Sequence, residues 1–397
     1  MPIRVLQITK ARELNQLFAG MKVDPYGIRI MAPKAEGFLI KLEGISSIAA
    51  NILKQEMLSC GGDVALPRDV VTGKAKKTGC VLIATLAQLS RLKEKLLLQP
   101  FGLSLLSREI AQVLKNYCQN NFKLDLGGYK FNLGQRPLVM GIMNLTPDSF
   151  SADGLYGKDI SEIAAVAEDM AAEGADILDL GGESSRPGAK SVGLKEELKR
   201  TIPVIKKITR TISIPISIDT SKPEVARAAL DNGASLVNDI SGLKNPAMAR
   251  ICSRYQAGIV IMHMKGTPRT MQKNPVYADL MAEIIEYLGR AVEIALAAGL
   301  KREKIIIDPG FGFGKTLEHN LQILKDLREL KVLGAPILVG ASRKRFIGEI
   351  LKVKPEERLA GTVAACVLAC ANGANIVRVH DVKSVVQALK VTQALLN

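Results

Sequence analysis

Eight short apolar runs in the second part of the chain end in polar side chains that could take part in chemistry. The residues at or just after these ends are Asn144, Glu183, Asp219, Asn238, His263, Asp308, Lys344 and the pair Arg378 and His380. Their carboxylates and amides can hydrogen-bond the edge of a polar heterocycle, and their cations can bind a phosphate. One polar residue at such an end is usually a loop cap, but eight ends together indicate a binding site.

The segment after the first run places three kinds of functional group within seven residues. Residues 144–150 read NLTPDSF and combine the amide of Asn144, the carboxylate of Asp148 and the ring of Phe150. The oxygens of such a loop could bind Mg²⁺, and the loop could close over a substrate. Asp148 could also serve only to form a turn, and that alternative stays open.

Two further segments are rich in glycine and polar groups. Residues 181–188, GGESSRPG, present the hydroxyl of Ser185 and the guanidinium of Arg186 on flexible backbone, which suits the binding of a leaving phosphate. Residues 308–316, DPGFGFGKT, are similar to a Walker A loop, but Pro309 stands where that motif requires glycine. We therefore reject a nucleotide-binding P-loop here.

The eight apolar runs are expected to be parallel strands. They are rich in β-branched residues and occupy 138–144, 175–181, 215–220, 235–240, 258–264, 304–310, 336–342 and 375–380. Near-continuous apolar strands that alternate with amphipathic helices are typical of a parallel sheet covered on both faces. Eight such units in roughly 260 residues predict an α/β fold of the (β/α)8 TIM barrel type, in which all strands end at one mouth.

The connections favour a barrel over an open sheet. Residues 161–174 and 221–233 combine helix-starting signals, apolar residues at helical spacing and a final glycine. Each of these helices stops close to the next strand, as the short αβ connections of a barrel require. An open doubly wound sheet would usually have a glycine-rich turn after its first strand, and residues 144–150 contain no glycine.

The first third of the chain has a different pattern and predicts a small α/β N-terminal domain. We expect residues 1–125 to be a basic domain of unknown role and residues 126–397 to be the barrel. The expected elements are strands at 2–8, 38–42, 63–66 and 80–84 and helices at 10–20, 46–59, 86–97 and 103–117. Residues 120–137 are interpreted as the boundary, although their alternation also suits a hairpin that covers the barrel floor.

Composition excludes several classes of protein. With 47% apolar residues the chain is not disordered, and its longest apolar run, residues 363–371, is too short to cross a membrane. The first residues have no signal-peptide core, so a cytoplasmic location is expected. Six cysteines without a C-x-x-C pair are expected to be small buried thiols, with a disulfide or zinc framework as the alternative. The first 130 residues carry 19 basic and 10 acidic side chains, which are interspersed, so nucleic-acid binding is not expected.

Eight segments, taken in order, resemble the successive motifs of the dihydropteroate synthase family. The segments are MGIMNLTPDSFSADG (140–154), DLGGESSRPGA (179–189), SIDTSKPEVARAAL (217–230), VNDISG (237–242), MHMKGTP (262–268), IDPGFGFGK (307–315), GASRKRFIG (340–348) and RVHDV (378–382). The resemblance covers residues 138–397. Two small departures are Ser185, where the family usually has threonine, and residues 153–157, DGLYG, where Asp-Gly-Gly is commoner.

The resemblance implies a reaction and a set of ligand contacts. The reaction condenses 6-hydroxymethyl-7,8-dihydropterin diphosphate with p-aminobenzoate to give 7,8-dihydropteroate and diphosphate, a step of folate biosynthesis. The implied pterin ligands are Asp219, Asn238, Asp308 and Lys344, the implied diphosphate ligands are Asn144, Arg378 and His380, and the implied neighbours of p-aminobenzoate are Ser185, Arg186, Phe150, Phe313 and Lys344. The implied cofactor is Mg²⁺, with Asn144 as its ligand, and the implied catalytic residues are Lys344, Arg378, His380 and Asp148.

The implied chemistry needs leaving-group stabilisation more than a strong base. Loss of diphosphate from a methylene on an electron-rich pterin can run through a carbocation, and Mg²⁺, Arg378 and His380 would stabilise the departing anion. The aniline nitrogen is nucleophilic without deprotonation. Sulfonamides, which are similar to p-aminobenzoate in shape and charge, are expected to compete with it.

Two alternative functions are kept open. A methyltetrahydrofolate–corrinoid methyltransferase would share the pterin-facing carboxylates and amide, but the TPDSF and SSRPG loops and the Arg-x-His of the last strand favour a diphosphate leaving group. A non-catalytic basic binding protein would not need an intact set of mouth residues. An assay for released diphosphate separates these alternatives.

Resemblance to the family also implies a homodimer. Residues 362–371, TVAACVLACA, predict a helix that is apolar nearly all round and must be buried by something, such as a second copy of the chain. The small-molecule substrates are the other expected partners.

Residues 1–125 match no family motif, so a chain that begins near Gly128 is expected to keep its turnover within about threefold.

Overall fold

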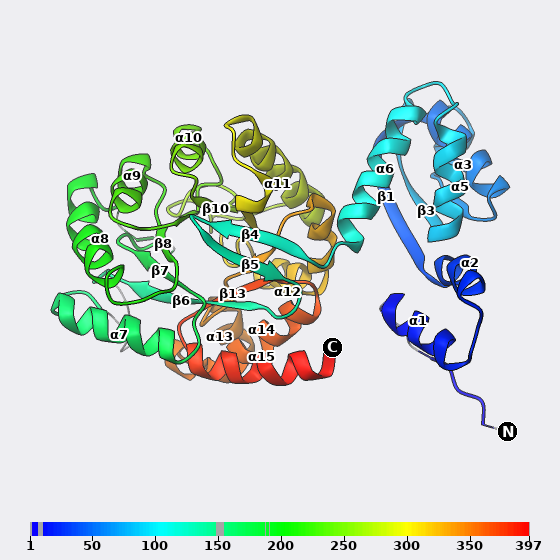
Figure 1. Cartoon of the computed structure of the whole chain (residues 1–397). Coiled ribbons are helices and arrows are strands. Elements are labelled where there is room, and N and C mark those ends of the chain that lie inside the picture. The colour runs from blue at the N-terminus through cyan, green and yellow to red at the C-terminus, as the bar shows by residue number, and fades with distance from the viewer. Residues whose placement is uncertain (1, 7–10, 148–154, 187, 190, 397) are drawn as a thin grey trace. The chain divides into compact units, whose positions relative to one another are not determined.

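The structure is a computed structural model of the chain, and it describes residues 2–6, 11–147, 155–186, 188–189 and 191–396 (Figure 1). The chain divides into two compact units, Met1–Lys115 and Asn116–Asn397. Each unit has its own hydrophobic core. The division falls within helix α6 (Leu103–Cys118), ahead of the boundary expected at residue 125.

The N-terminal unit is built on a three-stranded antiparallel sheet. Its strands lie in the order β1 (Gly37–Ser46), β3 (Lys77–Thr85) and β2 (Asp63–Ala65). Even-numbered residues of β3 are buried, and their odd-numbered neighbours are half-buried or exposed. Because side chains alternate across a strand, the sheet has one face in the core and one exposed face.

Helices cover the buried face of this sheet. The helices of the unit are α1 (Ala11–Gly20), α2 (Pro25–Ala35), α3 (Ser47–Ser59), α4 (Arg68–Val71), α5 (Leu86–Leu96) and most of α6. Helices α3, α5 and α6 supply most of the core side chains that pack on the sheet. Ser46 caps α3 and Thr85 caps α5, so each helix begins where a strand ends.

Three elements of the N-terminal unit differ from expectation: the strand expected at 2–8 and the helices α2 and α4, neither of which was predicted. Residues 2–6 form no strand, and Ile3 and Val5 are almost fully exposed because no sheet edge pairs with them among the described residues. The remainder of the expected strand at 2–8 lies outside those residues. Helix α2 was not predicted, since it contains Pro33 and buries none of its residues, so the sequence carries no apolar stripe there.

The C-terminal unit is a (β/α)8 barrel, as predicted. Its eight strands are parallel and neighbour one another in the order β11–β10–β9–β8–β7–β6–β13–β12. A parallel bridge between Ile307 and Ile337 joins the two outer strands. The strands are β6 (Leu138–Asn144), β7 (Ile177–Gly181), β8 (Ile216–Asp219), β9 (Leu236–Asp239), β10 (Gly258–Met262), β11 (Ile305–Asp308), β12 (Leu338–Val339) and β13 (Ile376–Val379).

Helices surround the barrel, and every strand lies inside one of the predicted apolar runs. The α-helices are α7 (Ile160–Ala172), α8 (Leu194–Ile208), α9 (Pro223–Asp231), α10 (Ala247–Arg254), α11 (Leu280–Ala297), α12 (Leu317–Lys325), α13 (Arg345–Leu351), α14 (Leu359–Ala371) and α15 (Val382–Leu396). Short 3-10 helices occupy Arg302–Lys304, Leu327–Leu333 and Pro355–Glu357. The strands are buried along nearly their whole length, as expected for strands covered by helices outside and side chains inside.

A β-hairpin covers the barrel floor, the end at which the strands begin (Figure 1). Strands β4 (Phe122–Leu126) and β5 (Tyr129–Leu133) pair antiparallel, which confirms the hairpin interpretation of residues 120–137. We call the apolar residues that meet here the floor cluster: Phe122, Leu124, Leu126, Leu133, Leu138, Met140, Ile177, Leu236, Val260, Ile306, Leu338 and Ile376. A Cβ at Gly258 would lie 2.4 Å from Leu126 Cδ2, so the hairpin approaches the strands too closely for any larger residue there.

All six cysteines are free thiols, and four of them are buried. The expectation of buried thiols holds for these four, whereas Cys118 is exposed and Cys370 is half-buried. Among the described residues, no helix is both long and apolar enough to cross a membrane.

Candidate active site

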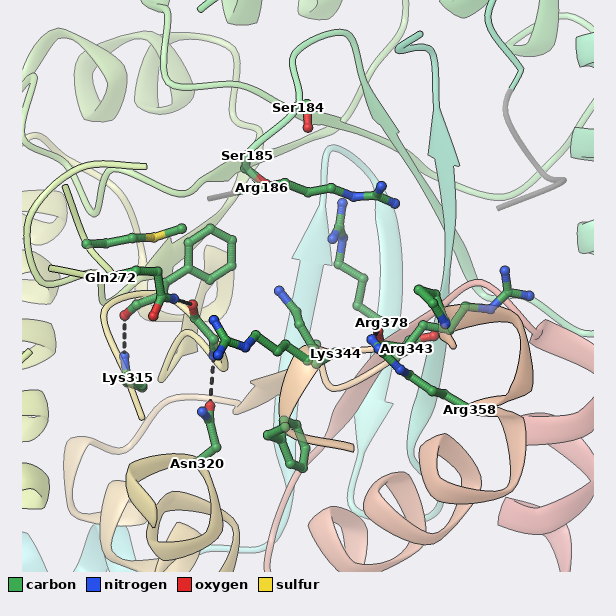
Figure 2. Close-up of a pocket in the computed structure, with 18 of the residues that line it drawn as sticks. Ser184, Ser185, Arg186, Gln272, Lys315, Asn320, Arg343, Lys344, Arg358 and Arg378 are labelled. Atoms are coloured by element: carbon green, nitrogen blue, oxygen red, sulfur yellow. Dashed lines mark hydrogen bonds between the residues drawn. The ribbon is translucent and has the colours of Figure 1, made fainter. Parts of the chain in front are cut away.

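A cavity of about 980 Å³ lies at the C-terminal ends of the barrel strands. Eight of the predicted site residues line it: Asn144, Ser185, Arg186, Asp219, Phe313, Lys344, Arg378 and His380. Figure 2 shows Arg186 on one side of this mouth, Lys315 and Asn320 on another, and Lys344 between them. The barrel thus brings together side chains that are more than 200 residues apart in sequence.

Two of the described site residues predicted from the sequence, Asn238 and Asp308, are not among those that line the cavity. Asn238 lies near the end of β9 and Asp308 ends β11, and their exposed fractions are only 3% and 5%. Both are therefore almost fully buried, and Asn238 contacts Asp179. Asp148 and Phe150 lie outside the described residues.

Arg378 is the centre of a buried ion cluster. Its Nε lies 2.5 Å from Asp179 Oδ2, and its Nη2 lies 2.7 Å from Asp219 Oδ2. Burial raises the pKa of Asp219 to about 7, with Arg378 opposing the shift and the charge of Asp179 adding to it. Two carboxylates can stay this close in a buried place because a guanidinium bridges them.

Asp179 also fixes the orientation of Asn238. The Asn238 amide Nδ2 donates to Asp179 Oδ2 at 3.0 Å. Because an ionised carboxylate can only accept hydrogen bonds, the amide must turn its NH₂ toward Asp179 and keep its Oδ1 as an acceptor. The other carboxylate oxygen of Asp179 has no hydrogen-bond partner among the described residues.

Lys344 stands at the N-terminal end of α13 and lies over an aromatic ring. Its Nζ is 4.3 Å from the centre of the Phe313 ring, a cation–π distance. Burial lowers the pKa of Lys344 to about 8, and Arg378 adds to this effect whereas Asp308 and Asp219 oppose it. Burial likewise raises the pKa of Asp308 to about 6, although the backbone N–H of Gly310 donates to it at 2.7 Å.

His380 is held by the neighbouring strand end. Its Nδ1 lies 3.0 Å from Ser342 Oγ, and its backbone N–H donates to the same oxygen at 3.2 Å. Its Nε2 lies 3.5 Å from Asn144 Nδ2. Burial lowers the pKa of His380 to about 3, and the nearby Arg343 and Arg378 add to this shift, so the imidazole is neutral at physiological pH.

The glycine-rich loop after β11 is held in place by four side chains. Gln272 Nε2 donates to Gly312 O at 2.7 Å, and Asn320 Oδ1 accepts the N–H of Gly312 at 2.8 Å. Tyr277 donates to Gly314 O and Lys315 donates to Phe313 O. This network fixes the backbone on which the Phe313 ring is carried.

His263 is a packed residue beneath this loop. Its Nδ1 lies 2.9 Å from Lys315 Nζ, and its ring packs edge-on against Tyr287. Burial lowers the pKa of His263 to about 2 and that of Lys315 to about 7. A neutral imidazole can accept a hydrogen bond from the lysine, so His263 supports the loop instead of facing the cavity.

The loop between β7 and α8, which carries Ser185 and Arg186, is closed by Glu183. Glu183 Oε1 accepts the N–H of Val192 at 3.0 Å, and its other oxygen contacts Lys222 Nζ. Lys222 also lies 2.5 Å from Glu197, a fully buried residue of α8. Burial lowers the pKa of Lys222, but the hydrogen bonds to Glu183 and Glu197 outweigh it and raise the pKa, so the lysine keeps its charge.

A metal ion bound by the described residues would need further oxygen ligands from the substrate. No group of three or more His, Cys, Asp or Glu side chains within the described ranges is arranged to hold a metal ion. Asn144 offers one amide oxygen at the end of β6. Mg²⁺ is commonly held by few protein oxygens together with phosphate oxygens and water, so this donor set fits an ion that arrives with a diphosphate.

Sequence reasoning overlooked three groups that shape the mouth. Asp179 lies within an apolar run and was passed over, although a charged residue pointing into a barrel is itself a signal of a polar site. Lys222 and Glu197 are separated by a strand and a loop, so only the fold shows that they meet Glu183. Ser342 was read as part of a motif without a role of its own.

The described geometry agrees with comparisons to known proteins. Residues 140–380 match the family model described as pterin binding enzyme. A dihydropteroate synthase of Synechocystis sp. is 49% identical over 274 residues, which are 68% of this chain and 94% of that protein. A probable bifunctional folylpolyglutamate synthase/dihydropteroate synthase of Halobacterium salinarum is 40% identical over 376 residues, 94% of this chain and 44% of that protein. The latter match is longer than the barrel unit, so it includes much of the N-terminal unit.

Solved structures give the same result for the barrel. The dihydropteroate synthase of Yersinia pestis, determined with a sulfonamide drug complex, has a TM-score of 0.67 and 42% identity, and the match covers 69% of this chain and 99% of that chain. The dihydropteroate synthase of Xanthomonas albilineans with 4-aminobenzoic acid has a TM-score of 0.64 and 44% identity, with 69% and 98% covered.

Proposed function

Because the chain belongs to the pterin-binding enzymes and, within them, to the dihydropteroate synthase family, we propose that it condenses 6-hydroxymethyl-7,8-dihydropterin diphosphate with p-aminobenzoate to give 7,8-dihydropteroate and diphosphate. The observation that carries this proposal is the Arg378 cluster at one mouth. There, the carboxylates of Asp219 and Asp308 and the amide of Asn238 suit a pterin. The cations of Arg378, Lys344 and Arg186 beside them suit diphosphate and p-aminobenzoate.

We assign the deepest polar groups to the pterin. Asp219 and Asp308 are the acceptors for the donor edge of its amino-pyrimidine ring, and Asn238 Oδ1 is oriented by Asp179 to accept a further hydrogen bond. The Lys344 ammonium donates to an acceptor of the ring. These four residues favour a small polar heterocycle as the ligand. A plain aromatic ring would leave their buried polar groups without hydrogen-bond partners.

We assign the diphosphate to Asn144, Arg378 and His380. Arg378 supplies a permanent charge, and the neutral imidazole of His380 supplies a hydrogen bond without moving a proton. Ser342 Oγ lies 3.0 Å from His380 Nδ1 and holds the imidazole at the mouth, and the tautomer of the ring decides which of the two groups donates. Bound through Asn144, Mg²⁺ would supply additional stabilisation of negative charge on the diphosphate.

We place p-aminobenzoate between the β7–α8 loop and the Phe313 ring. Ser185 and Arg186 present a hydroxyl and a guanidinium toward its carboxylate, and Lys344 lies over Phe313 at the junction of the two substrates. Phe150 and Asp148 complete this subsite in the proposal. No strong base is required, since the aniline nitrogen attacks as a neutral amine while the leaving anion is stabilised by cations.

Release of diphosphate tests the proposed reaction. The full chain with Mg²⁺ should release diphosphate only when both the pterin diphosphate and p-aminobenzoate are present. A sulfonamide should inhibit competitively against p-aminobenzoate. Transfer of a methyl group from methyltetrahydrofolate, or absence of any turnover, would reject the proposal, and competition of the sulfonamide against the pterin diphosphate would mean that the two subsites are misplaced.

We further propose a cytoplasmic homodimer that uses the outer face of α14. Ala360, Ala364 and Leu368 follow one another at helical spacing on that face and are exposed in the single chain, with Leu368 at 53%. Burial of such an apolar face by a second copy would remove it from water. Sedimentation at micromolar concentration should show a dimer, and a monomer alone would reject it. Cell fractionation tests the location.

A further inference from the structure

We propose that Arg358 and Thr362 are positioning residues that hold Arg343 in a left-handed turn and thereby keep Lys344 in the mouth. This inference rests on the proposed function, because it assigns the turn to the binding of the two substrates. Arg343, Lys344 and Arg358 line the same cavity, and in Figure 2 Arg343 and Arg358 lie together beside Lys344.

Arg343 has an unusual backbone conformation. Its φ is +53°, in the left-handed region that L-residues with a Cβ seldom adopt. The turn allows both of its neighbours to face the mouth: Ser342 contacts His380, and Lys344 lies over Phe313. Arg343 also lines the cavity, and its guanidinium forms a two-point ion pair with Asp381, at 2.5 Å and 3.0 Å.

Helix α14 and the residue before it supply the bonds that hold the backbone of this turn. Thr362 Oγ1 accepts the backbone N–H of Arg343 at 3.0 Å, and Arg358 Nη1 donates to the backbone carbonyl of Arg343 at 3.0 Å. Thr362 is fully buried. Both backbone polar groups of the strained residue are therefore paired by side chains from outside the loop, and strained conformations persist only where such surroundings enforce them.

Close packing keeps Arg358 in position. Its guanidinium lies flat against α13, since a Cβ built on Gly348 would be 2.2 Å from Arg358 Nη2 and 2.4 Å from its Nε. Its Nη2 also donates to Val353 O at 3.3 Å. The Arg358 Nε is buried without a hydrogen-bond partner in the described part of the chain, so the guanidinium is placed for its contacts with Arg343 and Val353 at the expense of that N–H.

The arrangement has a consequence for the charge of Lys344. Its lowered pKa depends on burial and on the charges that surround it in the mouth, which are Arg378, Asp308, Asp219, Arg186 and Lys315. His380 faces the same space as a neutral group. If the turn at Arg343 relaxes, Lys344 moves toward water and its pKa rises toward the ordinary value of 10.5.

The pH profile of the full-length enzyme tests this proposal. We expect kcat/KM of the unmodified chain to fall above pH 8 as Lys344 loses its proton, and Lys344→Arg to remove this alkaline limb. Thr362→Val removes the acceptor for Arg343 N–H with little change of volume. It should lower kcat/KM about threefold to tenfold and move the alkaline limb upward by one pH unit or more. Thr362→Ser keeps the hydroxyl and should restore both values.

A second variant keeps the proposal testable if Thr362→Val does not fold. Gly348→Ala adds a good helix former to α13 and displaces the Arg358 guanidinium, so it should move the same limb while the chain stays folded. Thr392→Val is the matched control, because Thr392 is also buried and its hydroxyl bonds only within α15. It should change the melting temperature without moving the limb.

The outcomes separate this inference from the proposed function. A limb that stays at the same pH in both Thr362→Val and Gly348→Ala, with proteins that melt cooperatively, overturns the positioning role. Equal shifts in Thr392→Val would show that any loss of stability moves the limb, and would overturn it as well. Failure of the unmodified chain to release diphosphate would instead reject the proposed function.

Discussion

The two ends of the barrel are built from opposite kinds of side chain. The mouth holds Asp179, Asp219, Lys344 and Arg378 at buried or half-buried positions, and burial raises the pKa of Asp219 and lowers that of Lys344. The floor cluster is wholly apolar and is covered by the β4–β5 hairpin. The same eight strands therefore serve chemistry at one end and stability at the other.

This difference predicts which substitutions should change stability and which should change turnover. Buried charges contribute little to stability unless they are fully paired, whereas buried leucines and isoleucines contribute through every atom removed from water. We expect changes at the floor to alter the free energy of unfolding and leave turnover unchanged. Changes at the mouth should lower turnover without lowering the free energy of unfolding.

The largest expected effect is at the floor. Leu126→Ala removes a fully buried side chain that packs against Gly258 and should lower the free energy of unfolding by about 2–5 kcal/mol. Denaturant unfolding measures this change. Turnover of the folded fraction at low temperature should match that of the unmodified chain, and a large loss of turnover there would break the comparison between the two ends.

Removal of the whole hairpin strand tests the boundary of the barrel. The structure places β4 with the barrel unit, so a chain that begins near Gly128 lacks Phe122, Leu124 and Leu126 and exposes the floor. We therefore correct the expectation that such a chain keeps its turnover, and expect it to fold poorly. A cooperative melt close to that of the full chain would show that the hairpin is dispensable.

At the mouth, Lys344→Ala should affect activity most. The loss of a charged hydrogen bond of about 1.5–3 kcal/mol implies a tenfold to hundredfold fall in kcat/KM. Removal of a buried ammonium should leave the melting temperature unchanged or raise it. Turnover equal to that of the unmodified chain would contradict the assignment of Lys344 to the site.

Asp219 should link stability to pH. Burial raises its pKa to about 7, so the folded chain retains a proton that the unfolded chain has lost. The contribution of this group to stability is present below pH 4 and is lost as the pH rises to about 7. Relative to the unmodified chain, Asp219→Asn should therefore gain stability between pH 5 and pH 8. Thermal melts at several pH values measure the difference, and a difference independent of pH would refute the shift.

The smallest effect is expected from removal of residues 1–115. Both ends of the barrel remain intact in a chain that begins at Asn116, so turnover should stay within about threefold, less than about 1 kcal/mol in barrier. Circular dichroism and a cooperative melt control for folding. A hundredfold loss with a raised KM for the pterin diphosphate would mean that the N-terminal unit contributes to the site.

The barrel could be predicted closely from the sequence because its strands are short apolar runs with polar ends, a local signal. Residues 138–144 coincide with β6 for this reason. The structure divides the chain after Lys115, ten residues ahead of the boundary predicted at 125. The packing of Phe122 and Leu124 depends on contacts with residues such as Ile376 far along the chain, which the local sequence does not reveal. Helix α2 has no buried face, so periodicity could not reveal it.

The residues at the mouth also divide into those that have a local sequence signal and those that do not. Strand-end residues such as Asp219 and Lys344 were found by type and position, since the fold itself brings strand ends together. Supporting contacts such as Asp179 with Asn238, or Thr362 with Arg343, join segments between 19 and 59 residues apart and carry no sequence signature of their own. They follow only from three-dimensional packing.

The hairpin that closes the floor has a kinetic consequence. Since β4 and β5 cover one end of the barrel, both substrates enter and both products leave on the side of the mouth. Asn238 and Asp308 lie deeper there than Ser185 and Arg186. If the pterin diphosphate binds the inner groups and p-aminobenzoate the outer groups, as proposed, the pterin diphosphate must arrive first. Steady-state measurements should then show an ordered mechanism in which p-aminobenzoate binds second.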